Sequence, residues 1–439
     1  QDFHSGTLSY LHQFNRDGHE LSGDLFFSSY GNRRTSTSRL TDATDVSSDG
    51  NKTFQSGPGT RIRFKTDYTL PLSGAGRLEI GHQAEITESD RTTGRYEYDN
   101  LSKEYLLQPQ YSYGTVSHRN EQSLYSLYSH SWKSLSYTIG LRSEYTYRHI
   151  SHPNTNATFQ LDRRDIFPSI HASYALNRQQ VMLSFSRRID RPGDRDLEPF
   201  QIWEDAYNLR IGNPSLKPEY IDSYEMGFQT PLGTNYLNIE LYYRVRHNVI
   251  EQISSFHSES VILHTPENTG TSYSYGTEAG YRFSPLSFWE VSASGNLRQY
   301  RIEGSIRERQ FSREHLNWSG LLRHALKFGH SWQIHIGSRY QSGIVTAQGK
   351  RDGHHSTDLA LQKSLFDGKL TASLQVRNLF NTADHESVTE TEYLTLRTSR
   401  TRESPIIMVS LRMNLGGFSS SEPRKPPAHS RDAGRSGSR

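Results

Sequence analysis

Arginine and aromatic residues gather in one part of the chain, and their chemistry is that of ligand recognition. Guanidinium groups form forked hydrogen bonds to carboxylates and phosphates, and aromatic rings stack on flat surfaces. We predict that six such residues contact an anionic or aromatic ligand: Arg188, Arg191, Arg195, Trp203, Tyr207 and Arg210. The alternative is that the aromatic rings belong to a girdle at a membrane–water interface.

The sequence shows no catalytic or metal-binding pattern. It lacks G-x-S-x-G, H-E-x-x-H and phosphate-binding glycine motifs in a suitable setting, and it contains no Cys. His354 and His355 open a predicted strand, so they point to opposite faces and do not form a shared metal site. His149 and His152, which we place in one loop, could touch a metal chelate, but a solvated loop is the simpler interpretation. We expect no enzyme activity, no cofactor and no resident metal.

The composition excludes several classes of protein. Only 33% of the 439 residues are hydrophobic, and no window approaches about 18 consecutive apolar residues, so a transmembrane helix is excluded. The 26 Tyr, 19 Phe and 5 Trp are too many for a disordered chain. The formal net charge of +3 argues against a nucleic-acid partner.

Apolar residues recur with a period of two. The alternation is clear at positions 135–141, 237–246 and 407–415, and a helix would instead place apolar residues three and four apart. Each run is about ten residues long, which is the length that a tilted strand needs to cross a membrane. These segments therefore predict membrane-crossing β-strands.

The connections between the strands alternate in length. Short connections lie at positions 15–19, 71–76, 133–134, 177–179, 231–234, 284–286, 329–330 and 367–368. Long segments lie between them, at positions 30–57, 87–120, 190–217, 249–270 and 382–402. Outer-membrane barrels have tight turns on one side and long loops on the other, whereas a soluble β-sandwich, the alternative, has no reason to separate them.

The sequence thus predicts an all-β fold, a transmembrane antiparallel β-barrel of about 17 strands over positions 1–417. A single-chain bacterial barrel normally has an even number of strands, so we expect an odd number to be missing upstream of Gln1. Five more would make a 22-stranded barrel, the size of plugged transporters. Positions 418–439 are rich in Ser, Pro, Gly and Arg and predict a disordered basic tail.

Two stretches carry a family resemblance. The first includes FSRRIDRP at 185–192, GNPSLKPE at 212–219 and SYEMG at 223–227, and the second is VRNLFN at 376–381. They resemble TonB-dependent receptor barrels, and are most similar to the outer-membrane β-barrel family of Bacteroidetes-type bacteria. The residues that carry the motifs are Asn213, Pro214, Leu216, Lys217, Pro218, Glu219, Glu225, Asn378, Leu379 and Phe380.

The resemblance implies a receptor in the outer membrane of a Gram-negative bacterium. Such a receptor actively imports a scarce nutrient, either a siderophore, a metal chelate, an oligosaccharide or a peptide. The resemblance also implies an upstream plug domain, preceded by a carboxypeptidase-regulatory-like domain. The expected partners are outer-membrane lipid, the TonB complex acting through the missing plug, a ligand at the extracellular loops, and a surface lipoprotein. A passive porin and a barrel-anchored surface binding protein are the alternatives.

The first motif also has a physical interpretation of its own. Pro214 and Pro218 fix φ and favour extended residues before them, so they steer the chain from a loop into a strand. Alternation then places Tyr224 toward lipid and Glu225 toward the lumen, where this carboxylate needs a cation. Arg188 and Arg244 are the candidates. We interpret the motif as a device for folding and strand register rather than for ligand binding.

Overall fold

The computed structural model of the chain describes residues 2–41, 47–153, 157–204, 207–258, 261–306, 308–329, 331–390 and 394–414. The predicted tail at 418–439 and the last residue of the third alternating run, Leu415, lie outside the described residues.

Seventeen long strands form one antiparallel sheet in the described residues. They are β1 (Asp2–Gln13), β2 (Glu20–Thr41), β3 (Ser47–Pro71), β4 (Gly76–Asp99), β6 (Tyr113–Trp132), β7 (Leu135–His152), β8 (Ala157–Leu176), β9 (Gln179–Asp190), β12 (Glu219–Leu232), β13 (Asn235–Ser258), β14 (Val261–Leu286), β15 (Trp289–Ile306), β16 (Arg309–Phe328), β17 (Trp332–Gln341), β20 (His354–Leu365), β21 (Leu370–Arg377) and β24 (Ile406–Met413). Three short strands, β5 (Glu104–Leu107), β10 (Ile202–Trp203) and β11 (Asn208–Arg210), complete this 20-stranded sheet. The prediction of an all-β barrel with about 17 strands is confirmed.

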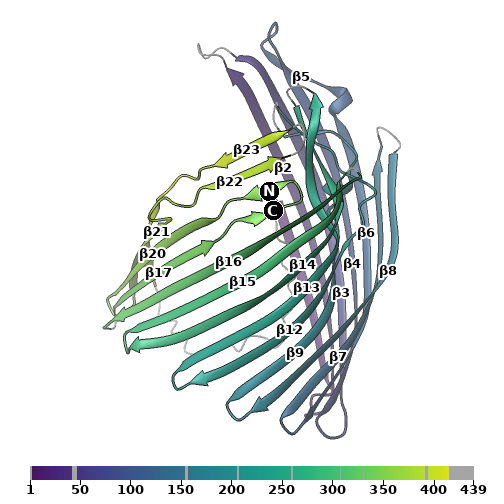
Figure 1. Ribbon diagram of the computed structural model, residues 1–439. Helices are drawn as coiled ribbons and strands as arrows, with labels where there is room; N and C mark the ends of the chain where they lie inside the picture. The colour runs from purple at the N-terminus through teal and green to yellow at the C-terminus, as the bar shows by residue number, and fades with distance from the viewer. Residues whose placement is uncertain are drawn as a thin grey trace.

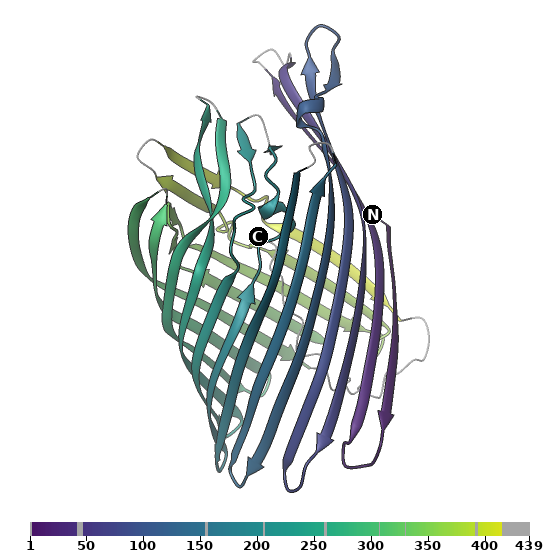
Figure 2. The ribbon, with the colours of Figure 1, turned by 90° about the vertical axis from the view of Figure 1, so that its right-hand side faces the viewer.

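The long strands pair in chain order, and the sheet curls around an interior (Figures 1 and 2). Strand β1 pairs with β2 at one end of the sheet, and β24 pairs with β21 at the other. Because each strand reverses the direction of the one before it, an odd number of strands leaves β1 and β24 running the same way. A total of 22 strands remains a prediction.

Short turns join the strands at one end of the wall, which is the lower end in Figure 2. In the reversals at 133–134 and 177–178, Lys133 and Asn177 adopt positive φ angles of 53° and 57°, as tight turns between strands often require. The turns lie where the sequence predicts them, with one exception. Strand β14 continues through Pro285 to Leu286, because an irregularity in the register after Phe283 accommodates the proline.

Most of the segments expected to be long loops are strands instead. The β2–β3 hairpin stays paired up to Thr41 and Ser47, and the β13–β14 hairpin up to Ser258 and Val261. These extensions rise beyond the apolar belt, where both faces of a strand can be polar. Their sequences therefore resemble loops, although the backbone still pairs, and the predicted loops at 30–57 and 249–270 are corrected on this ground.

A second, four-stranded sheet lies beside the upper part of the wall. Its strands are β18 (Ile344–Val345), β19 (Gly349–Arg351), β22 (His385–Glu390) and β23 (Thr395–Arg400). The helices described are one turn long, α1 (Asp194–Leu197) and the 3-10 helix η1 (Pro109–Tyr111). Among the helices of the described residues, none has the length and apolar character needed to cross a membrane.

Side-chain alternation gives the wall an apolar outer face and a polar inner face. The exposed apolar residues form a belt that includes Leu25, Phe27, Ile62, Ile80, Leu124, Ile139, Leu141, Ile170, Leu183, Met226, Leu241, Leu297, Leu316 and Leu411. Inside, Arg244 Nη2 lies 2.9 Å from Glu225 Oε1, so Arg244 supplies the cation predicted for this glutamate. The other candidate, Arg188, is exposed and forms no such pair in the described residues.

An arginine placed in the apolar belt should destabilise the barrel. Leu241 lies seven residues above the turn at 233–234, about 23 Å along a strand that rises about 3.3 Å per residue, so its tilted position is near the middle of the membrane. We expect Leu241→Arg to lower the free energy of unfolding in lipid vesicles by about 2–4 kcal/mol, measured by guanidinium titration. Ser294→Arg on the inner face is the control, and equal losses would contradict the assignment of the two faces.

Candidate ligand-binding site at the upper end of the barrel

The chain between β9 and β12 folds back against the inner side of the wall (Figure 2). We call residues 191–218 the inner strap; residues 205 and 206 within it are not described. Its short elements α1, β10 and β11 occupy the long-hairpin end of the barrel. This segment is the one that contains most of the predicted ligand-binding residues.

The first half of the strap is held by arginines of the wall. Arg148 Nη1 of β7 donates a hydrogen bond of 2.7 Å to the carbonyl oxygen of Pro192 and lies 3.5 Å from Asp194 Oδ1. Arg91 Nη1 of β4 lies 3.0 Å from Glu198 Oε1. Because the side chain of Arg148 is only 2% exposed, these charge-assisted bonds act in a poorly solvated place, where they are stronger than at a surface.

A small apolar core fixes the strap from below. Ile150 of β7 contacts Leu197 and Leu216 of the strap, and all three are buried. Gly212 brings the two halves of the strap together, since its N–H donates to Glu198 O over 2.8 Å and a Cβ would lie 2.5 Å from that oxygen. Only glycine fits this close approach without a shift of the backbone.

The second half of the strap is hydrogen-bonded to β14. Strand β11 pairs with residues 262–264 in parallel, and Ile211 N donates to His264 O over 3.0 Å. Asn268 then clamps the backbone of Lys217, because it accepts from Lys217 N at 2.8 Å and donates to Lys217 O at 2.9 Å. The strap is thus tied to β4 and β7 on one side and to β14 on the other.

The strap lies beside a break in the wall. The ladder between β8 and β9 ends at the Ser169–Ser186 pair, although β8 extends up to Ala157. Pro168, the next residue of β8, has no N–H to donate, and proline commonly marks such a ladder end. Above this point Tyr220 of β12 donates to Asp165 Oδ1 of β8 at 2.5 Å. Side chains and the strap therefore connect two parts of the wall that the backbone does not.

The first sequence motif forms the downstream anchor of the strap. Asn213 Oδ1 accepts from Ser215 N at 3.0 Å, which makes the turn that precedes Leu216. Glu219 Oε1 accepts from Ile250 N at 2.6 Å, and Glu219 Oε2 lies 3.0 Å from Arg246 Nη1. These contacts support a role in folding and register. Exposed Pro214 and buried Pro218 flank the anchor.

The second motif ends β21 with a turn. Asn378 has a φ of 49°, and its side-chain oxygen accepts from Thr382 N at 3.0 Å. Leu379 N donates to Thr357 O at 2.7 Å, so the turn is pinned to β20. Phe380 is 62% exposed, consistent with a structural position at the edge of the wall rather than in a core.

The structure separates the six predicted ligand-binding residues into two groups. Arg191 and Arg210 are used internally: Arg191 Nη2 lies 2.7 Å from Glu144 Oε2, and Arg210 pairs with Asp196. Trp203 is half-buried under the guanidinium of Arg95, 5.1 Å from its ring. The other group is exposed and comprises Arg195 and Tyr207 on the strap and Arg188 near the end of β9.

Several residues around the strap were not found by sequence reasoning. They come from strands far away in the chain: Arg91, Arg95 and Arg148. Arg91 and Arg95 are four residues apart, so strand alternation places them on the same face. This spacing was the one signal in the sequence that could have predicted that they act together. Nothing in their spacing relates them to Glu198, more than a hundred positions later.

His149 and His152 lie in strand β7 and not in the loop that the sequence predicted. His152 is buried, with its ring 3.8 Å from that of Phe200, and burial lowers the pKa of His152 below its ordinary value. The continued pairing of β7 with β8 up to the His152–Ala157 pair explains the error. In the described residues no group of three or more His, Asp or Glu side chains could hold a metal ion.

The strap encloses one unusual acid above the apolar belt. Burial raises the pKa of the Glu198 carboxyl above its ordinary value, and neighbouring Arg91 opposes this by a smaller amount. Burial, reinforced by the Glu198 charge, also raises the pKa of Tyr113 to about 12. Glu198 Oε2, His152 Nε2 and Trp203 Nε1 are buried polar atoms with no hydrogen-bond partner in the described residues. Such atoms mark places where water or a ligand completes the bonding.

Removing the apolar anchor should release the strap without unfolding the wall. We expect Leu216→Ala to weaken the strap by about 2–5 kcal/mol, because a buried leucine leaves a cavity when it is truncated. Limited trypsin digestion would then cut after the strap arginines much faster than in the unaltered protein. Leu101→Ala is the control, because Leu101 is 94% exposed. Equal cleavage of the two variants would contradict the anchoring role.

The strap should also be less protected at higher pH because of Glu198. Folding raises the pKa of this carboxyl, so its protonation stabilises the folded state. The stabilisation is complete at a pH below the pKa of the unfolded state, near 4.5, and it is lost as pH rises through the pKa of the folded state. We expect Glu198→Gln to reduce this loss, because glutamine does not ionise. The measurement is hydrogen-exchange protection of strap peptides between pH 4 and 8, corrected for intrinsic exchange rates. An unchanged pH profile in the variant would show that Glu198 does not govern the strap.

Comparisons with known proteins agree with this architecture. The model of the outer membrane protein beta-barrel family matches residues 12–412. No curated protein sequence matches the chain. The ferric citrate transporter FecA aligns at 13% identity with a TM-score of 0.63, covering 93% of this chain and 60% of FecA. The copper transporter OprC aligns at 14% identity and 0.63, covering 93% and 64%. The siderophore receptor PiuA from Acinetobacter baumannii aligns at 12% identity and 0.64, covering 91% and 62%.

At these identities the likeness shows a shared fold, and the chain spans less than two thirds of the length of those three proteins. The family match, in contrast, extends over nearly the whole chain, and the apolar belt gives the wall its place in the membrane. The chain therefore belongs to the outer membrane protein beta-barrel family, and its strands cross the bacterial outer membrane.

Proposed function

We propose that this chain is the membrane barrel of a TonB-dependent receptor that imports a small anionic ligand. The observation that carries the proposal is the inner strap, a folded segment that places arginine and aromatic side chains inside the upper end of an outer-membrane barrel. The similar structures support it, since they are those of a ferric citrate transporter, a copper transporter and a siderophore receptor. A siderophore, metal chelate, acidic oligosaccharide or peptide fits this chemistry.

Three exposed residues are the proposed first contacts of the ligand. Arg188, Arg195 and Tyr207 present two guanidinium groups and a phenol ring that is 48% exposed. Arginine recognises carboxylates through paired hydrogen bonds, and tyrosine adds an aromatic face. Arg191, Trp203 and Arg210 then act indirectly, because their contacts with the wall and within the strap keep the segment in place.

The remaining parts of the function follow from the receptor proposal. In this proposal positions 1–417 belong to the barrel, and positions 418–439, whose composition predicts a basic tail, follow it. Energy reaches the barrel from the TonB complex through an upstream plug, and a surface lipoprotein assists at the long-hairpin end. The barrel performs transport rather than catalysis.

Energised uptake separates this proposal from its alternatives. In cells that make the full-length protein, we expect accumulation of a labelled ligand, selected from a panel of ferric carboxylate, catecholate and hydroxamate chelates, acidic oligosaccharides and peptides. A protonophore should abolish accumulation but leave surface binding intact. Accumulation that survives the protonophore would indicate a passive channel. Binding without accumulation in energised cells would indicate a surface binding protein.

Removing a ligand-binding guanidinium should weaken surface binding. A hydrogen bond to a charged group contributes about 1.5–3 kcal/mol, so Arg188→Gln and Arg195→Gln should each lower affinity by roughly 10- to 100-fold. Arg164→Gln is the matched control, since Arg164 lies over the ring of Tyr145 in an exposed upper part of the wall, away from the strap. Equal effects of the three changes would indicate a general electrostatic contribution and not a site.

A further inference from the structure

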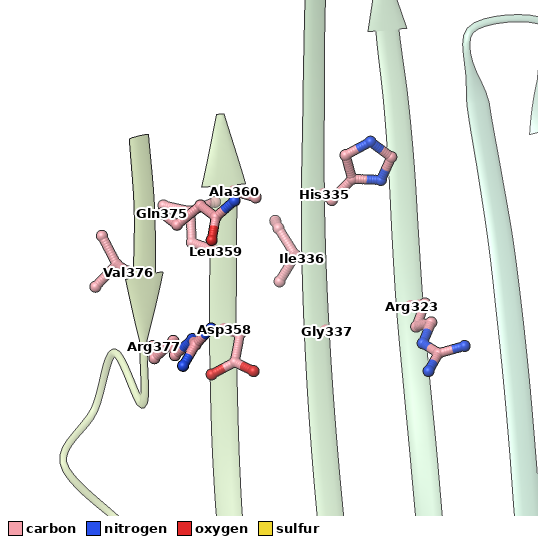
Figure 3. A pocket seen from close by; sticks show the side chains of 10 residues that line it. All are labelled: Arg323, His335, Ile336, Gly337, Asp358, Leu359, Ala360, Gln375, Val376 and Arg377. Carbon is pink, nitrogen blue, oxygen red and sulfur yellow. The ribbon is translucent and has the colours of Figure 1, made fainter. Parts of the chain in front are cut away.

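The basic side chains around the hollow at Gly337, on the inner face of the wall, do not converge. The hollow has a volume of about 350 Å³. Figure 3 shows that Arg323 points away from it and that Arg377 lies beside the carboxylate of Asp358. Basic side chains do gather in another place, on the face of the sheet that points away from the lumen, above the apolar belt.

Strands β2, β3 and β4, together with β5, rise above the neighbouring strands of the wall (Figures 1 and 2). On these strands the belt ends at the exposed row of Phe27, Ile62 and Ile86. Arg33 lies six residues further along β2, about 20 Å along the strand and about 15 Å above the row at a tilt of about 40°. We call the described residues of these four strands above the row the extension.

The contacts of β4 show which face of the extension points outward. Arg95 lies against Trp203 of the strap, so the odd-numbered positions of β4 face the lumen. Tyr96 is the next residue and therefore faces outward. Lys52 of β3 pairs with Tyr96, so even-numbered positions of β3 share this outer face. Through the pairing of β2 with β3, the odd-numbered positions of β2 share it as well.

The outer face of the extension places cations beside aromatic rings. The guanidinium carbon of Arg33 lies 5.9 Å from the centre of the Phe54 ring, and Lys52 Nζ lies 5.9 Å from the centre of the Tyr96 ring. At such distances a cation is attracted to the face of a ring. Arg33 is exposed, so its charge also remains available to a partner from outside.

The same arrangement continues higher on the extension. Arg39 Nε donates a hydrogen bond of 3.1 Å to Tyr105 Oη, and the rings of Tyr105 and Tyr98 are 5.4 Å apart. A Cβ at Gly50 would lie 3.2 Å from Tyr105 Oη, so glycine lets this ring lie close to the sheet. Six residues of this face form what we call the outer patch: Arg33, Arg39, Lys52, Phe54, Tyr96 and Tyr105.

The outer patch is positively charged. Its three cations form no ion pair with the described residues. Alternation places three acids on the same outer face, Asp2, Glu88 and Asp90, but all of them lie nearer the belt. Asp2 pairs with Gly31, two residues below Arg33, and the β3–β4 register places Glu88 lower still. The acids and the patch therefore occupy different heights above the membrane.

We propose that the outer patch binds the phosphorylated core saccharide of lipopolysaccharide in the surrounding outer leaflet. The long hairpins of an outer-membrane barrel lie on the extracellular side, where the sugars and phosphates of this glycolipid cover its acyl chains. Guanidinium and ammonium groups bind phosphate oxygens, and aromatic rings pack against the apolar faces of sugars. Because the patch faces away from the lumen, this contact is separate from the recognition of an imported ligand.

The first test compares glycolipids on the unaltered protein. The full-length protein in detergent micelles is titrated at fixed ionic strength with fluorescently labelled rough lipopolysaccharide, lipid A alone, or dephosphorylated lipopolysaccharide, and anisotropy reports binding. We expect the intact glycolipid to bind at least tenfold more tightly than the other two, because only it carries both the core saccharide and its phosphates. Equal affinity for lipid A and the intact glycolipid would overturn the proposal.

A pair of double variants tests the charges of the patch. Arg33→Gln with Lys52→Gln should weaken binding of the intact glycolipid roughly tenfold or more, since charge-assisted contacts are lost. Arg34→Gln with Arg63→Gln is the matched control, because it removes the same charge from the inner face of β2 and β3. Equal losses in the two variants would show a general electrostatic attraction and would overturn the proposal.

A third comparison tests the rings without changing any charge. Phe54→Thr with Tyr96→Thr keeps residues that strands favour, so the extension should fold, and binding of the intact glycolipid should fall at least tenfold. Gln55→Thr, at the neighbouring position on the inner face, is the control. Undiminished binding in the ring variant would overturn the proposal, including the case in which the patch serves another protein. Loss of glycolipid binding with normal energised uptake would leave the receptor proposal untouched.

Discussion

The backbone ladder is the constraint on which the rest of this structure depends. In hydrocarbon no water can satisfy an N–H or C=O group, so each membrane-crossing residue must bond to a neighbouring strand. The pairing from β1 to β24 meets this demand for the strands between these two, whereas β1 and β24 each pair on one side in the described residues. Once the backbone is satisfied, alternate side chains are free to take opposite roles. Apolar residues such as Leu241 face the lipid, and charged residues such as Arg244 face the interior.

The strap lies where the backbone ladder between neighbouring strands ends. Above the belt, water can satisfy the backbone, and the β8–β9 ladder already stops at Ser169 and Ser186, at the level of the belt residues Ile170 and Leu141. The two sides of the break are then held by side chains and by the strap, with Arg148 on one side and Asn268 on the other.

The sequence predicts the wall much better than the strap. A period of two and short turn signals are local, so the strands, their faces and the Glu225–Arg244 pair follow from neighbouring positions. Strands that rise into water lose the apolar signal, and for that reason the β13–β14 extension looked like a loop. The contact of Arg91 with Glu198 joins residues 107 positions apart, and no spacing rule reveals such a pair. The motif at 213–219 predicted the passage from a loop into a strand, but not the residues that it contacts.

Some of the interior charges reduce the stability of the barrel, so stability alone does not explain how they are arranged. Glu240 of β13 lies directly opposite Glu278 of β14, and like charges in such cross-strand pairs are destabilising. Arg244 offsets only part of this, at 2.9 Å from Glu225 and 3.6 Å from Glu240. Arginines without an ion pair among the described residues, such as Arg63 of β3 and Arg323 of β16, lie elsewhere on the same inner face. A barrel built only for stability would have paired these charges with each other.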